Sequence, residues 1–372
     1  MAKTKLAPRP PKAHGSSAPG ASHFSGAFDP RNAQWRGLLR EEIIDPAEPL
    51  IDAHHHLWNK PGQPYMLDEY LADAVTGHNI RASVFVECGA YYRRHGPELM
   101  NRLGEVEFAN GIAAMAEGAA GNEVLVANAI VGTADVTVGA EVGRLLDAQI
   151  AAAGGRFKGI RLITKWDEDE GLNNGRYIIP RGLLADQDFR AGFAELGCRG
   201  LSFDTMVYHP QLPEVLDLSR AFPESRIVLN HIGGLIAATP TYIARRDEAV
   251  EDWKRGMKAL ASCPNVYVKL GGLGMPYLGF GLEKLDAPVP SARLAEVWGP
   301  YFRFCIDTFG PARCMFESNF PPDRESVDFP IVWNAFKRVA SSYSDTERHD
   351  LLFGAAARFY RCLLYTSPSP RD

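Results

Sequence analysis

Three consecutive histidines are the densest group of chemically active side chains in the sequence. His54, His55 and His56 stand in the run Ile51–Trp58, where a short apolar segment ends. If that segment is a β-strand, its side chains alternate, so His54 and His56 share one face and His55 points the other way. Two imidazoles on one face can hold a divalent metal or bind a carbonyl oxygen. A hydrogen-bonded structural pair is the alternative, and the spacing favours function.

Further polar residues stand where other apolar runs end. His231 ends the run that begins at Val228, and the glycines that follow permit close approach of the backbone. We expect a functional role for His231. His209 follows an earlier run. It could be a further ligand or a residue of the loop, and the sequence favours neither. In the last run, Glu317 and Asn319 are two residues apart and should share a face.

Two buried-looking cations could contact a substrate. Arg161 lies in an apolar run and could anchor a substrate carboxylate through two parallel hydrogen bonds. A buried ion pair with an acid such as Asp204 is an equally good interpretation, and Lys269 has the same two interpretations. Glu87 ends another run and Tyr91 follows it, so both are weaker candidates for lining a pocket.

The elements that must position these residues alternate along the chain. Short apolar runs are separated by longer segments with helical length and spacing, which is typical of βα units and a parallel sheet. The predicted strands are Leu50–His54, Ala82–Glu87, Val124–Val131, Phe157–Leu162, Gly200–Val207, Arg226–Leu229, Val266–Leu270 and Cys314–Glu317. The predicted helices are Pro97–Gly118, Ala140–Ala153, Asp186–Leu196, Leu212–Ala221, Ala244–Ala261 and Ala292–Phe309.

Eight such strands predict an α/β protein built as a single (β/α)8 TIM barrel, with its active site at the C-terminal ends of the strands. A doubly wound open sheet is the alternative, but it would want a glycine-rich turn after the first strand, where this chain has His56-Leu57-Trp58-Asn59. We predict a disordered extension over residues 1–40 and the barrel over 41–361. Residues 362–372 form a non-native-looking tail, to which we assign no function.

Composition excludes several classes of protein. The chain has 372 residues, is 46% hydrophobic and 23% charged, and carries a formal net charge of −5, which does not favour a nucleic-acid partner. No apolar stretch is long enough to span a membrane. Six cysteines without a C-x-x-C pair predict reduced thiols and a cytoplasmic protein, with organellar import as the minor alternative.

The order of the motifs resembles a known family. The runs DAHHHLW, FVECGAYY, FKGIRL, LSFDTMVYHPQ, VLNHIGG, NVYVKLGGL and MFESNFPPD together resemble the amidohydrolase-2 (amidohydrolase-related) family over about residues 40–361. Within it, the chain is similar to the predicted metal-dependent hydrolases of TIM-barrel fold, a lactonase-like group that includes sugar-acid lactonases and the 2-pyrone-4,6-dicarboxylate lactonase.

The resemblance implies roles for matched positions only. His54 and His56 match the strand-one pair, and His231 matches the strand-six histidine. The strand-eight position that normally carries an aspartate, the general base, is Asn319 here. A neutral amide cannot take a proton from water. Glu317 or Asp323 could supply the carboxylate instead, and we prefer Glu317.

The resemblance therefore implies a hydrolase that opens a lactone of a small carboxylated substrate by attack of activated water. His54, His56 and His231 would stabilise the oxyanion directly or hold one divalent metal, with zinc preferred; relatives also work without metal. A metal-dependent decarboxylase and an inactive barrel that serves as a binding protein remain alternatives. Long loops at 59–70, 91–105, 165–182 and 271–290 should set the substrate, and a homodimer is left open.

Overall fold

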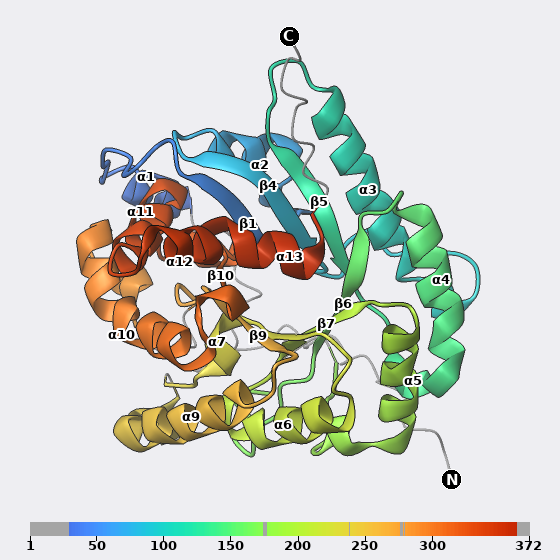
Figure 1. Ribbon diagram of the computed structural model, residues 1–372. Helices are drawn as coiled ribbons and strands as arrows, with labels where there is room; N and C mark the ends of the chain where they lie inside the picture. The colour runs from blue at the N-terminus through green and yellow to red at the C-terminus, as the bar shows by residue number, and fades with distance from the viewer. Residues whose placement is uncertain (1–29, 174–176, 238, 276–277, 279, 363–372) are drawn as a thin grey trace, which may run out of the picture.

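The computed structural model describes residues 30–173, 177–237, 239–275, 278 and 280–362 (Figure 1). Residues 1–29 of the predicted extension (1–40) and residues 363–372 of the predicted tail (362–372) lie outside the described part of the chain. Eight strands form one sheet in chain order. They are β1 (Pro49–His55), β4 (Asn79–Val86), β5 (Leu125–Gly132), β6 (Phe157–Ile163), β7 (Ser202–Met206), β8 (Ile227–Leu229), β9 (Val266–Leu270) and β10 (Cys314–Phe316).

Every neighbouring pair along this sheet is parallel. The first and last strands meet just beyond their ends: the His56 N–H donates to the Phe320 carbonyl at 2.8 Å, and the Asn319 N–H donates to the His54 carbonyl at 2.9 Å. These bonds close the sheet into a barrel and bring the segment after β10 against the end of β1. The predicted TIM barrel is confirmed.

Helices between the strands cover the outside of the barrel (Figure 1). The six predicted helical segments correspond to α3 (Leu103–Gly118), α4 (Gly143–Ala152), α5 (Gln187–Cys198), α6 (Leu212–Ala221), α9 (Arg246–Ala261) and α10 (Ser291–Phe309). The structure adds α2 (Leu67–Ala74), α11 (Phe329–Ala340), α12 (Asp345–His349), α13 (Ala355–Tyr360) and the short helices α7 (His231–Gly234) and α8 (Pro240–Ile243). The apolar faces of these helices and of the strands form the main core.

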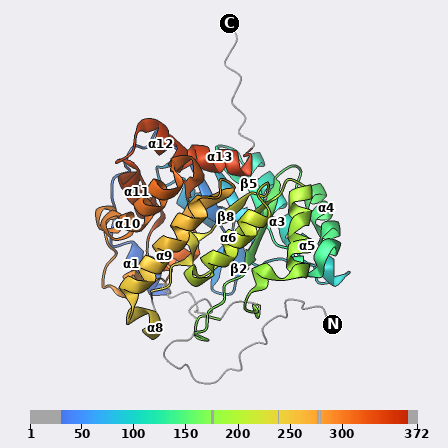
Figure 2. The same cartoon turned by 60° about the horizontal axis from the view of Figure 1, so that its bottom comes forward.

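The inside of the barrel has a second apolar layer, which α13 closes at one end. Inward residues such as Ile51, Val84 and Met315 form one buried cluster with Phe359 and Tyr360 of α13. Since Tyr267, near the start of β9, packs against the same cluster, α13 covers the N-terminal ends of the strands. Figure 2 shows α13 on the opposite side of the barrel from β2 (Trp58–Lys60).

The ordered structure starts earlier than the predicted boundary at residue 41. Residues Pro30–Arg36 form helix α1. The Trp35 indole N–H donates to the Leu285 carbonyl at 2.8 Å, and Arg36 Nη1 donates to the Arg324 carbonyl at 3.1 Å. This part of the predicted extension therefore packs on the loops that follow β9 and β10.

All six cysteines are free thiols, as predicted from their spacing. Among the described residues, none of the helices is both long and apolar enough to cross a bilayer.

Candidate active site

A bulge at the end of β1 turns the histidines into position. Ala53 faces the barrel interior, so simple alternation would turn His54 outward. The register of β1 against β4 shifts between Asp52 and His55, however. After this irregularity His54 and His56 face inward, and His55 packs outward with its Nε2 2.9 Å from Ser83 Oγ. Bulges beside active sites re-aim side chains in this way.

His56 has a defined proton arrangement. Its Nδ1 lies 2.7 Å from the Val86 carbonyl oxygen, which can only accept, so Nδ1 carries the hydrogen. The Nε2 atom of neutral His56 is therefore an acceptor, and it lies 3.1 Å from His54 Nε2. On its other side the His56 ring is nearly parallel to Trp58, with ring centroids 5.9 Å apart.

Glu317 joins two of the histidines. Its Oε2 lies 2.8 Å from His54 Nδ1, and its Oε1 lies 2.6 Å from His231 Nδ1 and accepts the His231 backbone N–H at 3.2 Å. A Cβ atom at Gly272 would lie 2.4 Å from His231 Nδ1, so only glycine leaves room for this ring. Both Glu317 oxygens therefore face the Nδ1 side of an imidazole.

This arrangement suits a divalent cation. Glu317 accepts from Nδ1 of His231, so the Nε2 atom of that ring is a lone-pair donor, as in His56. Glu317 Oε2 lies 2.8 Å from Nδ1 of His54 without a hydrogen bond, and this Nδ1 contacts the Lys269 ammonium. Carboxylates that hold metal-ligating histidines in this way are common. Nitrogens bound to tetrahedral zinc lie ~3.3 Å apart, given Zn–N distances of ~2.0–2.1 Å. The 3.1 Å between His54 and His56 is close to this. His54, His231 and Glu317 also form a group of buried donors that could hold a metal ion.

His54 and His56 are neutral. Burial, reinforced by the nearby Lys269, holds the pKa of His54 well below its usual value. Burial, reinforced by Arg161, does the same to the pKa of His56. His54, His56 and His231 are 0%, 4% and 2% exposed. Neutral imidazole is the form that ligates metals.

Lys269 contacts His54 and is a member of a buried ion pair. Its Nζ is 2.8 Å from Asp204 Oδ2 and 3.3 Å from His54 Nδ1. Both side chains of the pair are fully buried. The structure therefore supports the interpretation of Lys269 as a member of a buried ion pair rather than as a substrate anchor.

Arg161 pairs with Glu87, which corrects the partner suggested from the sequence. Arg161 Nε donates to Glu87 Oε1 at 2.9 Å, and Nη2 donates to the Glu87 carbonyl. Asp204 is the register partner of Arg161 on β7, but its carboxylate turns to Lys269. Glu87, a weak candidate from sequence, therefore fixes the guanidinium at the barrel mouth.

Sequence reasoning missed Lys165, four residues after Arg161. Lys165 is buried just beyond β6, with its Nζ 5.3 Å from the centroid of the Tyr208 ring. Burial, reinforced by the charge of Arg161, lowers the pKa of Lys165 to about 8. Two cations so close together favour an anionic group between or beside them. The sequence could have indicated Lys165, because it is a second cation four residues after Arg161 at the end of the same strand.

The segment after β10 is braced internally. Asn319 adopts a positive φ of 52°, and its Nδ2 donates to Asp323 Oδ1 at 2.7 Å. Asp323 Oδ2 accepts the Gly274 N–H at 3.1 Å, and burial raises the pKa of this carboxyl well above its usual value. Asp323 thus holds two loops together and does not join the histidines.

Two other predicted residues lie apart from the histidines. His209 Nδ1 accepts the Ile236 N–H at 3.3 Å, and its ring packs on Tyr242. Tyr91 is 44% exposed at the rim and stacks on Phe108 with ring centroids 4.0 Å apart.

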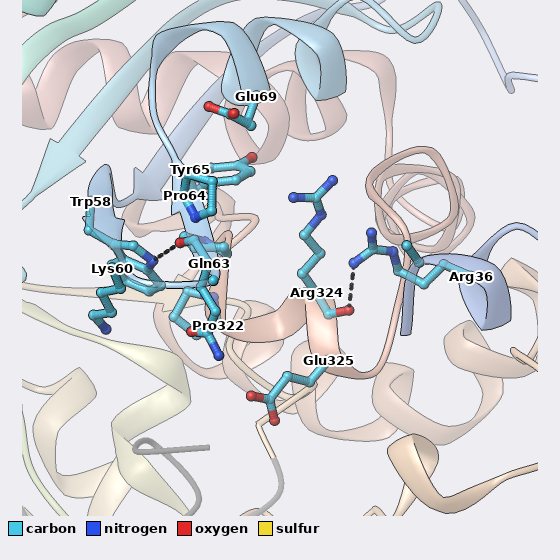
Figure 3. Close-up of a pocket in the computed structure, with 13 residues that line it drawn as sticks. Arg36, Trp58, Lys60, Gln63, Pro64, Tyr65, Glu69, Pro322, Arg324 and Glu325 are labelled. Atoms are coloured by element: carbon cyan, nitrogen blue, oxygen red, sulfur yellow. Dashed lines mark hydrogen bonds between the residues drawn. The ribbon is translucent and has the colours of Figure 1, made fainter. Parts of the chain in front are cut away.

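A cavity of about 280 Å³ opens beside the histidine cluster (Figure 3). It lies between the hairpin of β2 and β3 (Gln63–Tyr65) and the turn Pro322–Glu325, and α1 contributes Arg36. Trp58, which stacks on His56, forms part of its wall. The cavity therefore shares one side chain with the histidine site.

The fold and the site together define a (β/α)8 barrel with an imidazole–carboxylate cluster at its C-terminal end. Comparison with known proteins agrees: the family model described as amidohydrolase matches residues 51–362. This chain belongs to that family.

Three similar proteins illustrate its relatives. Uncharacterized protein y4mH of Sinorhizobium fredii is 31% identical over 334 residues, covering 84% of this chain and 98% of that protein. An L-fucono-1,5-lactonase of Burkholderia multivorans is 30% identical over 194 residues, covering 52% of this chain and 60% of the lactonase. The solved structure of an amidohydrolase from Burkholderia multivorans with bound zinc has a TM-score of 0.58 and 24% identity, and covers 84% of this chain and 99% of that one.

Proposed function

We propose that this chain hydrolyses a lactone of a small carboxylated substrate at the cluster of His54, His56, His231 and Glu317. The observation that carries the proposal is the Glu317 carboxylate, which accepts from Nδ1 of His231 at 2.6 Å and lies 2.8 Å from Nδ1 of His54, so that one buried charge faces two neighbouring imidazoles. The similarity to an L-fucono-1,5-lactonase supports the choice of a lactone over other hydrolase substrates.

The three Nε2 atoms of His54, His56 and His231 would hold one divalent ion, with zinc preferred. When bound, such an ion polarises a carbonyl oxygen and lowers the pKa of bound water to ~7. Without an ion, an imidazole N–H aimed at the developing oxyanion is worth roughly 3–4 kcal/mol when well placed. The Val86 carbonyl fixes His56, Glu317 fixes His231, and Lys269 contacts Nδ1 of His54, so each ring is already held in place.

Glu317 acts through the rings rather than on water directly. Both of its oxygens face imidazole nitrogens, so a proton from the attacking water reaches it only by way of an imidazole. When no ion occupies Nε2 of His231, a proton taken up there leaves an imidazolium, and the Glu317 charge stabilises it at 2.6 Å from Nδ1. This assignment changes our expectation that Glu317 itself is the base, and it makes an aspartate at position 319 dispensable.

The substrate carboxylate would lie against Arg161 and Lys165. Both cations are buried where β6 ends, and the charge of Arg161 contributes to the lowered pKa of Lys165, so a carboxylate placed there would interact favourably with both. The remainder of the substrate would extend toward Trp58 and the adjoining cavity, where Tyr65 and Pro322 offer flat walls (Figure 3).

A panel assay tests this proposal. Purified protein should contain about one divalent metal per chain and should release acid from at least one sugar-acid lactone, measured with a pH indicator. Glu317→Gln should lower kcat/KM by at least ~100-fold, because the neutral amide removes the buried charge that faces both imidazoles. Surface variant Glu296→Gln is the matched control, since Glu296 is exposed and pairs with Arg293 on the same helix.

Other outcomes identify the alternatives. Release of carbon dioxide from an aromatic acid, with no lactone opened, would show a decarboxylase. A metal-loaded protein that binds sugar acids and turns over neither class would show a binding protein.

A further inference from the structure

A line of buried polar groups crosses the barrel interior from its closed end to the active site. The Tyr360 hydroxyl, on α13, donates to Asp204 Oδ2 at 2.6 Å. Lys269 Nζ lies 2.8 Å from the same oxygen and 3.3 Å from His54 Nδ1. All four side chains are fully buried, so the line has no contact with solvent. It links the last helix of the barrel to the first histidine of the site.

Stability alone does not explain this line. Burying an ammonium and a carboxylate is costly, and a well-packed apolar group often serves the interior better. The neighbouring layer of this barrel shows that solution, with Ile51, Val84 and Met315. The ion pair stands instead against His54, where Lys269 Nζ is within hydrogen-bond distance of Nδ1 and can donate to it.

The bonding at Asp204 shows how Lys269 is held in place. Oδ2 accepts hydrogen bonds from the Tyr360 hydroxyl, from Lys269 Nζ and, at 3.3 Å, from Asn230 Nδ2. Oδ1 has no hydrogen-bond partner in the described part of the chain. The carboxylate is thus fixed by its Oδ2 side, and the Tyr360 hydroxyl is its shortest contact. Without that hydroxyl, Asp204 can rotate and draw Lys269 Nζ away from His54.

At His54 two groups compete for one atom. Lys269 Nζ lies 3.3 Å from Nδ1 and can only donate to it, whereas Glu317 Oε2 lies 2.8 Å away without forming a hydrogen bond. The position of Nζ therefore decides how the His54 ring sits between them, and with it the direction of Nε2 toward His56.

We propose that Tyr360, Asp204 and Lys269 form a positioning unit that sets the His54 ring from beneath, so that the C-terminal helix α13 supports the active site. These are positioning residues, since none lies among the groups that would touch the substrate. The inference rests on the proposed function only for its activity readout.

The test compares two tyrosine-to-phenylalanine variants. Tyr360→Phe removes the hydroxyl that holds Asp204. Tyr267→Phe is the matched control, because Tyr267 packs on Phe359 of the same helix and its hydroxyl makes no hydrogen bond within the described residues. The main readout is the ¹⁵N signal of the His54 ring in histidine-labelled, metal-free protein, assigned with His54→Gln. It requires no substrate.

Tyr360→Phe should shift the His54 nitrogen signals and leave those of His209 in place. It should also weaken zinc binding about tenfold and lower kcat on an accepted lactone more than it changes KM. Tyr267→Phe should match the wild type within twofold in each measurement. Unchanged His54 signals in folded Tyr360→Phe would overturn the proposal.

Two further measurements keep the test decisive if Tyr360→Phe does not fold. Asp204→Asn keeps the volume of the side chain but cannot balance the ammonium charge, and it should shift the same His54 signals. In the unmodified protein, the Lys269 ammonium protons should exchange slowly and show a nuclear Overhauser effect to the His54 ring. If that effect is absent, the positioning unit does not exist. If it is present but no lactone is opened, only the proposed function fails.

Discussion

His55 and its two neighbours occupy opposite sides of one strand end, although their burial is almost the same. His54 and His55 are fully buried, and His56 is 4% exposed. Burial lowers the pKa of all three, to about 3 for His55. Neither burial nor the pKa therefore separates a structural histidine from a functional one at this position.

The partners of the rings do separate them. His55 stacks on Tyr70 with ring centroids 4.1 Å apart, and its Nε2 is bonded to Ser83 Oγ. These partners belong to the layer between the barrel and its helices. His54 and His56 instead turn their Nε2 atoms to each other, and the Lys269 ammonium and the Val86 carbonyl hold their Nδ1 atoms. Converging nitrogen atoms fixed from behind are therefore the mark of the functional pair.

The largest effect is expected for His54→Gln. The variant should lower kcat/KM by at least ~1000-fold and zinc affinity by at least ~100-fold, because glutamine offers no ring nitrogen opposite His56. Calorimetric titration of zinc and initial rates on an accepted lactone would measure both losses. An equal loss in His55→Gln would show that the two sides of the strand do not differ in function.

For His55→Gln we expect a loss of stability in place of a loss of function. Removing a buried ring that stacks on Tyr70 should lower the free energy of unfolding by roughly 2–4 kcal/mol. Urea denaturation at pH 7.5 would measure it. Zinc affinity should stay within about threefold of the wild type in the folded variant. A stable variant that fails to bind zinc would assign His55 to the site.

Most of the fold could be predicted from regular apolar patterns in the sequence. The predicted strand Val266–Leu270 has the same bounds as β9, and the helix Leu212–Ala221 has the same bounds as α6, because apolar spacing and flanking breakers mark both. The hairpin of β2 and β3 lies inside a segment read as a loop. Its strands have three residues each, too few to show an alternation.

The site was harder to predict than the fold, because partners across a barrel depend on how strands stagger. Asp204 is the register neighbour of Arg161, yet the carboxylate that pairs with Arg161 is Glu87, from β4's end. Sequence spacing carries no information on such distant pairs. Tyr360 gave no signal at all, since its contact with Asp204 joins residues 156 positions apart. The catalytic roles of His54, His56, His231 and Glu317 stay predictions.

The smallest effect concerns two buried histidines outside the cluster, His78 and His209. Burial lowers the pKa of each from 6.5 to about 4. Above pH 6.5 neither the folded nor the unfolded chain binds a proton at these rings. As the pH falls from 6.5 toward 4, the unfolded chain binds protons at these rings and the folded chain does not, so the free energy of unfolding decreases. At pH 5.5 each ring should cost about 1 kcal/mol.

Substitutions that keep the hydrogen bonds isolate this effect. In His209→Asn the amide oxygen can replace Nδ1 as acceptor of the Ile236 N–H, and in His78→Gln the amide nitrogen can replace Nε2, 3.1 Å from the Pro330 carbonyl. Urea denaturation should show the double variant losing about 2 kcal/mol less than the wild type between pH 7.5 and 5.5. Parallel pH profiles would mean that both rings take up protons as readily in the folded chain as in the unfolded chain.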